Sequence, residues 1–235
     1  MKASVSRAAG AGFAALFKGL KTVRPDRPIH PSGVALTGTI KRSTSTTSSG
    51  IPWIDSPGSD AVEGRMSRSL GAPRRWPDIL GLALSIHTDT GPAHLLLAST
   101  GASRAGRWLL LPRRDAGTSA FTSLMPYKGT NGPVLLAALP EPTGPRLPAM
   151  PLAFRQALGA GNWTLGLYYA TLTGPWIRFG TLTLAAEPKT NDTRTRFDPA
   201  AHPLPGAGTY RWASNLRAPA YATARKDKHA TEKDS

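Results

Sequence analysis

Cysteine is absent from the 235-residue chain, which excludes disulfide bonds, thiolate metal sites and a cysteine nucleophile. This composition fits a reducing compartment, and we expect a cytoplasmic protein. No apolar run approaches the roughly 20 residues of a membrane-spanning helix, so no membrane partner is expected. The first 20 residues begin like a signal peptide. However, Lys18 interrupts their apolar stretch and no clear cleavage site follows, so we expect a short amphipathic helix there.

Acidic residues are scarce: 14 Asp and Glu stand against 29 Lys and Arg, which gives a formal net charge of +15. Such an excess favours anionic partners. The alternative is a generally basic surface, because no run of Arg and Lys is long enough to form a discrete patch. Aromatic residues such as Trp53, Trp76 and Tyr127 are not interleaved with basic residues as a stacking platform requires. Nucleic acid is therefore not the expected partner.

Several common catalytic motifs are also missing. The chain has no Gly-rich phosphate loop, no nucleophile elbow and no acidic cluster for two metal ions. None of its five histidines lies at metal-ligand spacing from another on one helix face. A hydrolase of ordinary type is therefore not indicated by any motif.

The segments that are present predict a mainly β (α+β) fold. Apolar or alternating stretches, separated by Gly, Pro and Asp, predict strands at 34–42, 61–68, 79–87, 93–100, 132–140, 162–173 and 177–187. A further strand is expected in 119–127, and the clearest hairpin turns at "GPW" (174–176). Seven or eight strands predict a closed antiparallel barrel of about eight strands, whose lumen is either filled by side chains or holds one small ligand.

The expected organisation has three parts. Residues 1–26 form an arm with a short helix, residues 27–187 form the barrel, and residues 188–235 hold a Pro-rich connector, a C-terminal helix and a charged tail. The helix is expected from about position 214, because Ser214 or Asn215 can cap it and Pro219 is tolerated near its first turn.

Three residues, one before the expected strands and two well after them, could carry chemistry. His30 stands directly before the first strand, where a desolvated neutral imidazole can act as an acid or base. Arg217 and Tyr221 are four apart on the expected C-terminal helix and so share a face. A cation beside a phenol lowers the phenol pKa, and phenolate suits ferric iron. The same pair also fits a tyrosine packed under a guanidinium with no metal.

The order and spacing of these residues carry a resemblance to a known family. Arg27, His30 and Gly33 match a segment R-x-x-H-x-x-G, and Arg217 with Tyr221 matches R-x-x-x-Y. The segment between them supplies Arg65, Met66 and Ser67, followed by Pro77, Asp78, Gly81, Leu82 and Ala83. On these motifs the chain resembles the haem catalase superfamily, especially its short catalase-related peroxidases.

The resemblance implies a haem b site. In the family pattern Tyr221 is the axial ligand of the iron and Arg217 holds its phenolate. Arg65 contacts a haem propionate, and Arg27 belongs to the cofactor-binding set. His30 is the distal acid and base, and the Ser67 hydroxyl hydrogen-bonds it.

Two departures from the family pattern limit what the resemblance implies. Ala98 stands where catalases carry a distal Asn, and an alanine side chain cannot donate a hydrogen bond; Met66 replaces the usual Phe. The resemblance thus implies a peroxidase-like protein acting on hydrogen peroxide or an organic hydroperoxide, rather than a fast catalase. The alternative is a haem-less barrel that serves as a binding protein or as a hydrolase of anionic esters, for example a phosphodiesterase. Whether the chain is an enzyme, and its oligomeric state, stay open.

Overall fold

The computed structural model describes residues 33–210, apart from positions 46, 74, 189, 191, 194 and 196. All of the described residues belong to one compact unit, His30–Tyr210. The expected helices in 1–26 and from 214 lie outside the described residues. So do Arg27, His30, Arg217 and Tyr221.

Ten strands and three short helices make up the described part of the chain. The strands are β1 (Gly33–Arg42), β2 (Gly58–Arg68), β3 (Leu80–Thr88), β4 (Gly91–Thr100), β5 (Ala120–Thr122), β6 (Tyr127–Gly129), β7 (Gly132–Pro140), β8 (Trp163–Ala170), β9 (Ile177–Ala186) and β10 (Gly208–Thr209). The helices are α2 (Pro52–Asp55), the 3-10 helix η1 (Gly106–Trp108) and α3 (Pro151–Leu158). No helix among these residues is both long and apolar enough to span a bilayer.

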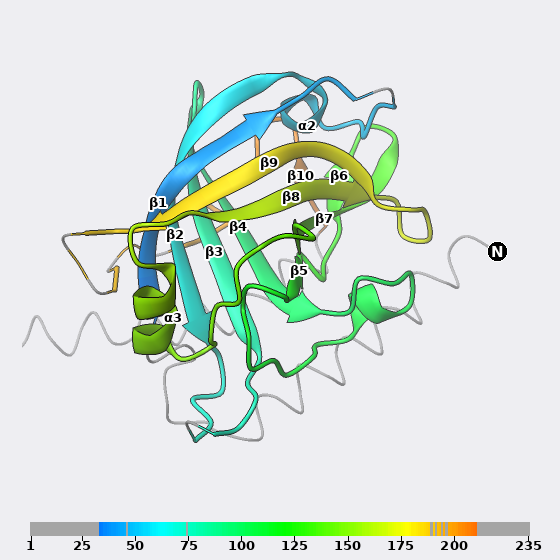
Figure 1. Ribbon diagram of the computed structural model, residues 1–235. Helices are drawn as coiled ribbons and strands as arrows, with labels where there is room; N and C mark the ends of the chain where they lie inside the picture. Colours follow the sequence, from blue (N-terminus) through cyan, green and yellow to red (C-terminus); the bar gives the residue numbers. More distant parts are fainter. Residues whose placement is uncertain are drawn as a thin grey trace, which may run out of the picture. The chain divides into compact units, whose positions relative to one another are not determined.

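Eight of the strands close into an antiparallel barrel, which confirms the predicted fold class (Figure 1). The order β5-β4-β3-β2-β1-β9-β8 runs around the barrel, and β7 closes it by pairing with both β5 and β8. The short strands β6 and β10 extend from β7 outside this ring. The hairpin between β8 and β9 turns at 171–176, where the sequence predicts it.

Alternate residues of each strand fill the interior of the barrel. On β2, Val62 and Met66 belong to the hydrophobic core, as do Leu82 and Leu84 on β3. At the end of the core, Trp163 is fully buried between the edges of Phe121 and Phe154, with ring centroids 5.8 and 5.4 Å away. The lumen of this barrel is therefore filled by side chains, which is one of the two arrangements expected for a barrel of about eight strands.

The strand expected in 119–127 is two strands, β5 and β6, separated by an irregular turn. Leu124 adopts a left-handed backbone conformation there, with φ of 56°. A leucine gives no sequence signal for this conformation, because its Cβ makes it unfavourable. The break ends the pairing of β5 with β4 and lets β6 pair only with β7 and β10.

Candidate functional site

The predicted site residues of the barrel lie on its outer wall, formed by β1 to β4. Because Val62 and Met66 point into the core, Arg65 and Ser67 point outward. The physical reason is the two-residue alternation of a strand, which places neighbours on opposite faces. A ligand that contacts this pair therefore lies against the outside of the barrel rather than in its lumen.

Antiparallel pairing aligns four small residues in one row across this wall. Gly33 of β1 is opposite Ser67 of β2, Ser67 is opposite Gly81 of β3, and Gly81 is opposite Ala98 of β4. The row is low, since none of its members carries a side chain larger than a hydroxymethyl group. Ser67 is only 4% exposed although it faces away from the core. The row is thus smooth and largely buried, and the hydroxyl of Ser67 is its one polar side-chain group.

The row next to it contains the positive charge of the site. Arg65 lies opposite Ala35 on one side and Ala83 on the other, so again small residues flank the functional side chain. A Cβ added to Gly33 would lie 2.8 Å from the guanidinium of Arg65. Arg65 therefore packs directly against the start of β1, and Gly33 leaves room for it.

Arg65 already holds a carboxylate of this chain. Its Nε lies 2.6 Å from Oδ1 of Asp192, and its second terminal nitrogen lies 2.8 Å from Oδ2. The same carboxylate accepts hydrogen bonds from the backbone N–H of Gly33 and of Thr193. Partial burial alone raises the pKa of Asp192, but the bonds and charge of Arg65 and these two amides outweigh it, so the pKa lies below 3.8. The pair is therefore ionised at neutral pH.

A second contact fastens the segment after β9 to the same wall. The backbone N–H of Asp198 donates to Nδ1 of His94 on β4, at 2.8 Å. The backbone N–H of His94 donates to the carbonyl of His202, and the two imidazole rings are 4.5 Å apart. His94 lies on the outward face of β4, in the register that opposes Ser85. We refer to residues 192–202 as the strap, because its two ends bind β1–β2 and β4.

The residues of the wall are chemically suited to a flat ligand that carries a carboxylate. The low row has no side chain larger than a hydroxymethyl group, and the guanidinium of Arg65 can hold a carboxylate with two parallel hydrogen bonds. Haem is flat and carries carboxylates, so these residues are chemically compatible with it if Asp192 releases the guanidinium of Arg65. No three His, Asp or Glu side chains converge to hold a metal ion within the described ranges. The iron ligand predicted by sequence, Tyr221, lies outside the described residues.

The barrel and its outer wall define a catalase-like fold. Two solved structures show the likeness: a bacterial catalase and a fungal catalase, each with a TM-score of 0.60 and 14% sequence identity. They cover 90% and 83% of this chain, respectively. The matches include 59% and 57% of the two catalase chains, so this chain spans less than two thirds of either. No family model and no curated protein matches the sequence.

The sequence motifs predict roles for Arg65 and Ser67, which stay predictions, but they do not reveal that Asp192 binds the arginine. Asp192 follows Arg65 by 127 positions in a connector without periodicity, and no local pattern links the two. The sequence shows only that His94 does not lie at metal-ligand spacing from another histidine, and it gives no sign of the contact with Asp198. The signal for its role is the alternation of β4, which places it on the same face as Ala98.

Proposed function

We propose that the protein is a catalase-fold haem protein that processes hydrogen peroxide or an organic hydroperoxide in a peroxidase-like manner. The observation that carries this proposal is the bidentate hold of Arg65 on a carboxylate beside the low row of Gly33, Ser67, Gly81 and Ala98. A wall of this kind suits a planar ring with an acidic substituent.

Haem b would be held by an exchange of carboxylates. Arg65 releases Asp192 and takes a propionate in the same two-pronged geometry, so that one charge-assisted pair replaces another. On the motifs that resemble the catalase family, Arg27 and Arg217 would help to hold the cofactor and the Tyr221 phenolate would bind its iron. When bound, haem supplies a ferric iron that can activate a peroxide.

The distal chemistry belongs to His30 and Ser67. The Ser67 hydroxyl faces outward from β2 and would orient the imidazole of His30. His30 would then take the proton from one oxygen of the hydroperoxide and return it to the leaving oxygen. Ala98 supplies no hydrogen bond at the far end of the row, so we expect peroxidase turnover with a reductant to exceed dismutation of hydrogen peroxide.

The absorption spectrum of the full chain tests this proposal. Haem is added to the purified protein, and the Soret band is compared with that of the Tyr221→Phe variant and of a control, Tyr168→Phe, whose ring lies on β8. We expect a shifted Soret band for the wild type and for the control, and its loss or displacement for Tyr221→Phe. A wild-type band that Tyr221→Phe leaves unchanged would contradict the ligand assignment.

One observation favours a second candidate, a barrel that binds no haem. The guanidinium of Arg65 is satisfied within the chain by Asp192, and the row ends in Ala98 rather than in a polar residue. Such a protein would serve as a binding module or act on anionic esters. A wild type that stays colourless after haem titration would support it. The peroxide partner and the cytoplasmic location stay predictions.

A further inference from the structure

Three loops at one end of the barrel are joined into a single layer. They are residues 69–79 between β2 and β3, 101–119 between β4 and β5, and 141–150 between β7 and α3. Asp78 and Arg113 exchange backbone hydrogen bonds of 3.0 and 2.8 Å. The N–H of Ala149 donates to the carbonyl of Arg114 at 2.8 Å. The middle loop is thus tied to both neighbours, and the surface they share is held in place by backbone pairing.

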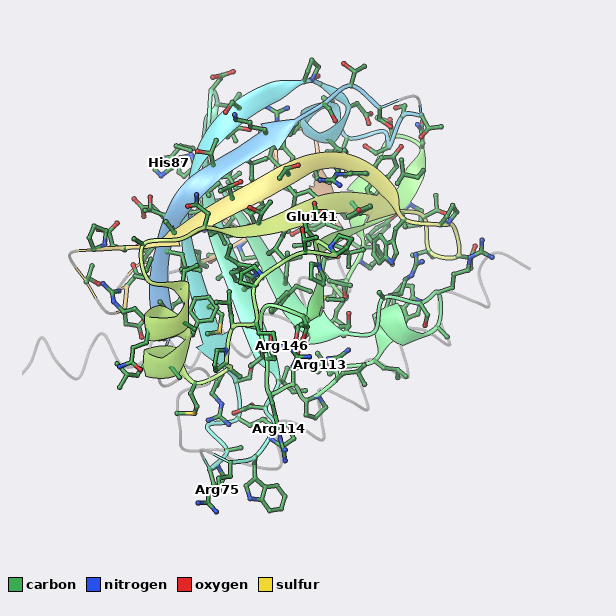
Figure 2. All side chains as sticks on the ribbon, viewed as in Figure 1. Arg75, His87, Arg113, Arg114, Glu141 and Arg146 are labelled. Carbon is green, nitrogen blue, oxygen red and sulfur yellow. The ribbon has the colours of Figure 1, made fainter. Side chains whose placement is uncertain are left out.

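Four arginines from these loops form what we call the arginine face: Arg75, Arg113, Arg114 and Arg146. None of them makes an ion pair with any residue that the structure describes. Figure 2 shows them in succession along the same end of the unit, and Arg75 lies farthest from the barrel. Three of the four side chains are exposed. Arg75, Arg114 and Arg146 can therefore meet an external anion, whereas Arg113 is half-buried and donates to the carbonyl of Thr100 at 3.3 Å.

The acidic residues of the same loops do not neutralise this face. Asp78 is fully buried, where it lies 3.3 Å from the Nε of Arg68 and accepts the N–H groups of Leu70 and Ala72. Asp115 accepts the N–H groups of Thr118 and Leu147. Glu141 pairs with Arg178 of β9. Each carboxylate is thus occupied within the protein, which leaves a net positive surface.

One aromatic ring stands beside these charges. Trp76 follows Arg75 directly, lies two residues from the Asp78–Arg113 pair, and is 67% exposed. Its backbone is fixed, because its carbonyl accepts a hydrogen bond from Arg68 at 3.0 Å. An exposed indole on an anchored loop is a surface on which a flat ring can stack.

We propose that the arginine face and Trp76 bind single-stranded nucleic acid, with the guanidinium groups on phosphates and the indole under a base. Guanidinium forks match phosphate geometry, and aromatic stacking tolerates any base. The sequence does not favour this partner, because its basic and aromatic residues are not interleaved. The fold gathers them from three loops. An anionic membrane is less well matched, since Trp76 and Leu109 are the two exposed large hydrophobic residues among the described residues of the three loops.

The test uses the full chain and a fluorescent (dT)20 oligonucleotide, followed by anisotropy at several salt concentrations. Two double variants each remove two positive charges: Arg114→Ala with Arg146→Ala on the face, and Lys41→Ala with Lys128→Ala on β1 and β6. We expect the first to weaken binding strongly and to reduce the salt slope by about 0.7 for each phosphate that the variant no longer binds. The lysine variant should stay close to wild type. Trp76→Ala should weaken binding at least fivefold, which is roughly the lower limit for one stacked base.

Three results would overturn the proposal. The first is an equal fall in affinity in the two double variants, which would mean a diffuse charge effect. The second is unchanged binding in Trp76→Ala together with tight binding to heparin, which would mean that the face binds any polyanion and recognises no base. The third is binding to vesicles with 30% anionic lipid but not to the oligonucleotide, which would mean a membrane surface. Thermal melting of each variant confirms that a loss of binding is not a loss of folding.

Discussion

Asp192 holds the guanidinium of Arg65 with both carboxylate oxygens, at 2.6 Å from Nε and 2.8 Å from the terminal nitrogen. This pair joins the strap to the outer wall of the barrel at the point where the catalase resemblance expects a propionate. Any acidic ligand of Arg65 must therefore compete with a carboxylate of the protein itself. The competition makes Asp192 a determinant of ligand affinity.

Asp192→Asn should tighten haem binding. The amide keeps the size of the side chain but loses the charge, so Arg65 becomes more available to a propionate. Charge-assisted hydrogen bonds are worth about 1.5 kcal/mol or more, and we expect the dissociation constant to fall by about tenfold in a Soret titration at pH 7. Asp198→Asn in the same strap is the control and should change it little. Weaker binding in Asp192→Asn would show that the carboxylate supports the ligand rather than competes with it.

The same pair should make stability depend on pH in the acid range only. The pKa of Asp192 is lowered in the folded protein, so its contribution is fully present above the unfolded value and is lost as the pH falls through the folded one. Urea denaturation should give a constant difference in unfolding free energy between wild type and Asp192→Asn from pH 6 to pH 8. That difference should shrink below about pH 4. A difference that changes between pH 6 and 8 would point to another titrating group.

The other end of the strap should respond nearer to neutral pH. Burial and the nearby ring of His202 lower the pKa of His94 below 6.5, and the carboxylate of Asp198 opposes them. Nδ1 accepts the Asp198 N–H, so it must be unprotonated in the fold. The unfolded chain then binds more protons below about pH 6.5, and stability falls as the pH drops from 7 to 5.

His94→Gln removes this titration and is the measurement that isolates it. The unfolding free energy of the variant, taken relative to that of the wild type, should rise as the pH is lowered from 7 to 5. His87→Gln on the exposed part of β3 is the control. Parallel curves for wild type and His94→Gln would contradict the assignment.

The packing at the end of the core predicts a large effect of one substitution. Phe154 of α3 is fully buried and lies edge-on to Trp163, with ring planes at 76°. Phe154→Ala should destabilise the protein by about 3–5 kcal/mol, because it removes buried area and leaves a cavity. Chemical denaturation measures this. Leu152→Ala on the exposed side of the same helix should cost less than about 1 kcal/mol.

The strands of the barrel can be predicted because their signal is local. Leu82, Leu84 and Ile86 alternate with smaller or polar residues, and the structure buries all three. The helix α3 is absent from the sequence prediction, although Pro151 at its start and Gly159 after its end are the usual boundary residues. A run of eight residues between prolines and glycines is read more readily as a loop.

The site can be predicted only in part, for a related reason. Motif spacing points to Arg65 and Ser67, because both lie within three residues on one strand, and their roles toward a ligand stay predictions. The partner of Arg65 and the arginine face depend on contacts between distant loops. Loop residues carry no periodic pattern, so the pairing of Arg113 with Asp78 becomes visible only when the strands are in register.

The pairing of β7 with both β5 and β8 closes the barrel, and this closure affects association with other chains. Among the described residues, each of the eight ring strands has a neighbour on both sides over at least part of its length, which reduces the number of backbone donors and acceptors open to an incoming β-strand. In the described part of the chain, the sheet ends at β10, which is two residues long and offers little edge to a foreign strand. Self-templated growth into fibrils is therefore disfavoured by topology, even though the ring strands are rich in Leu and Ile.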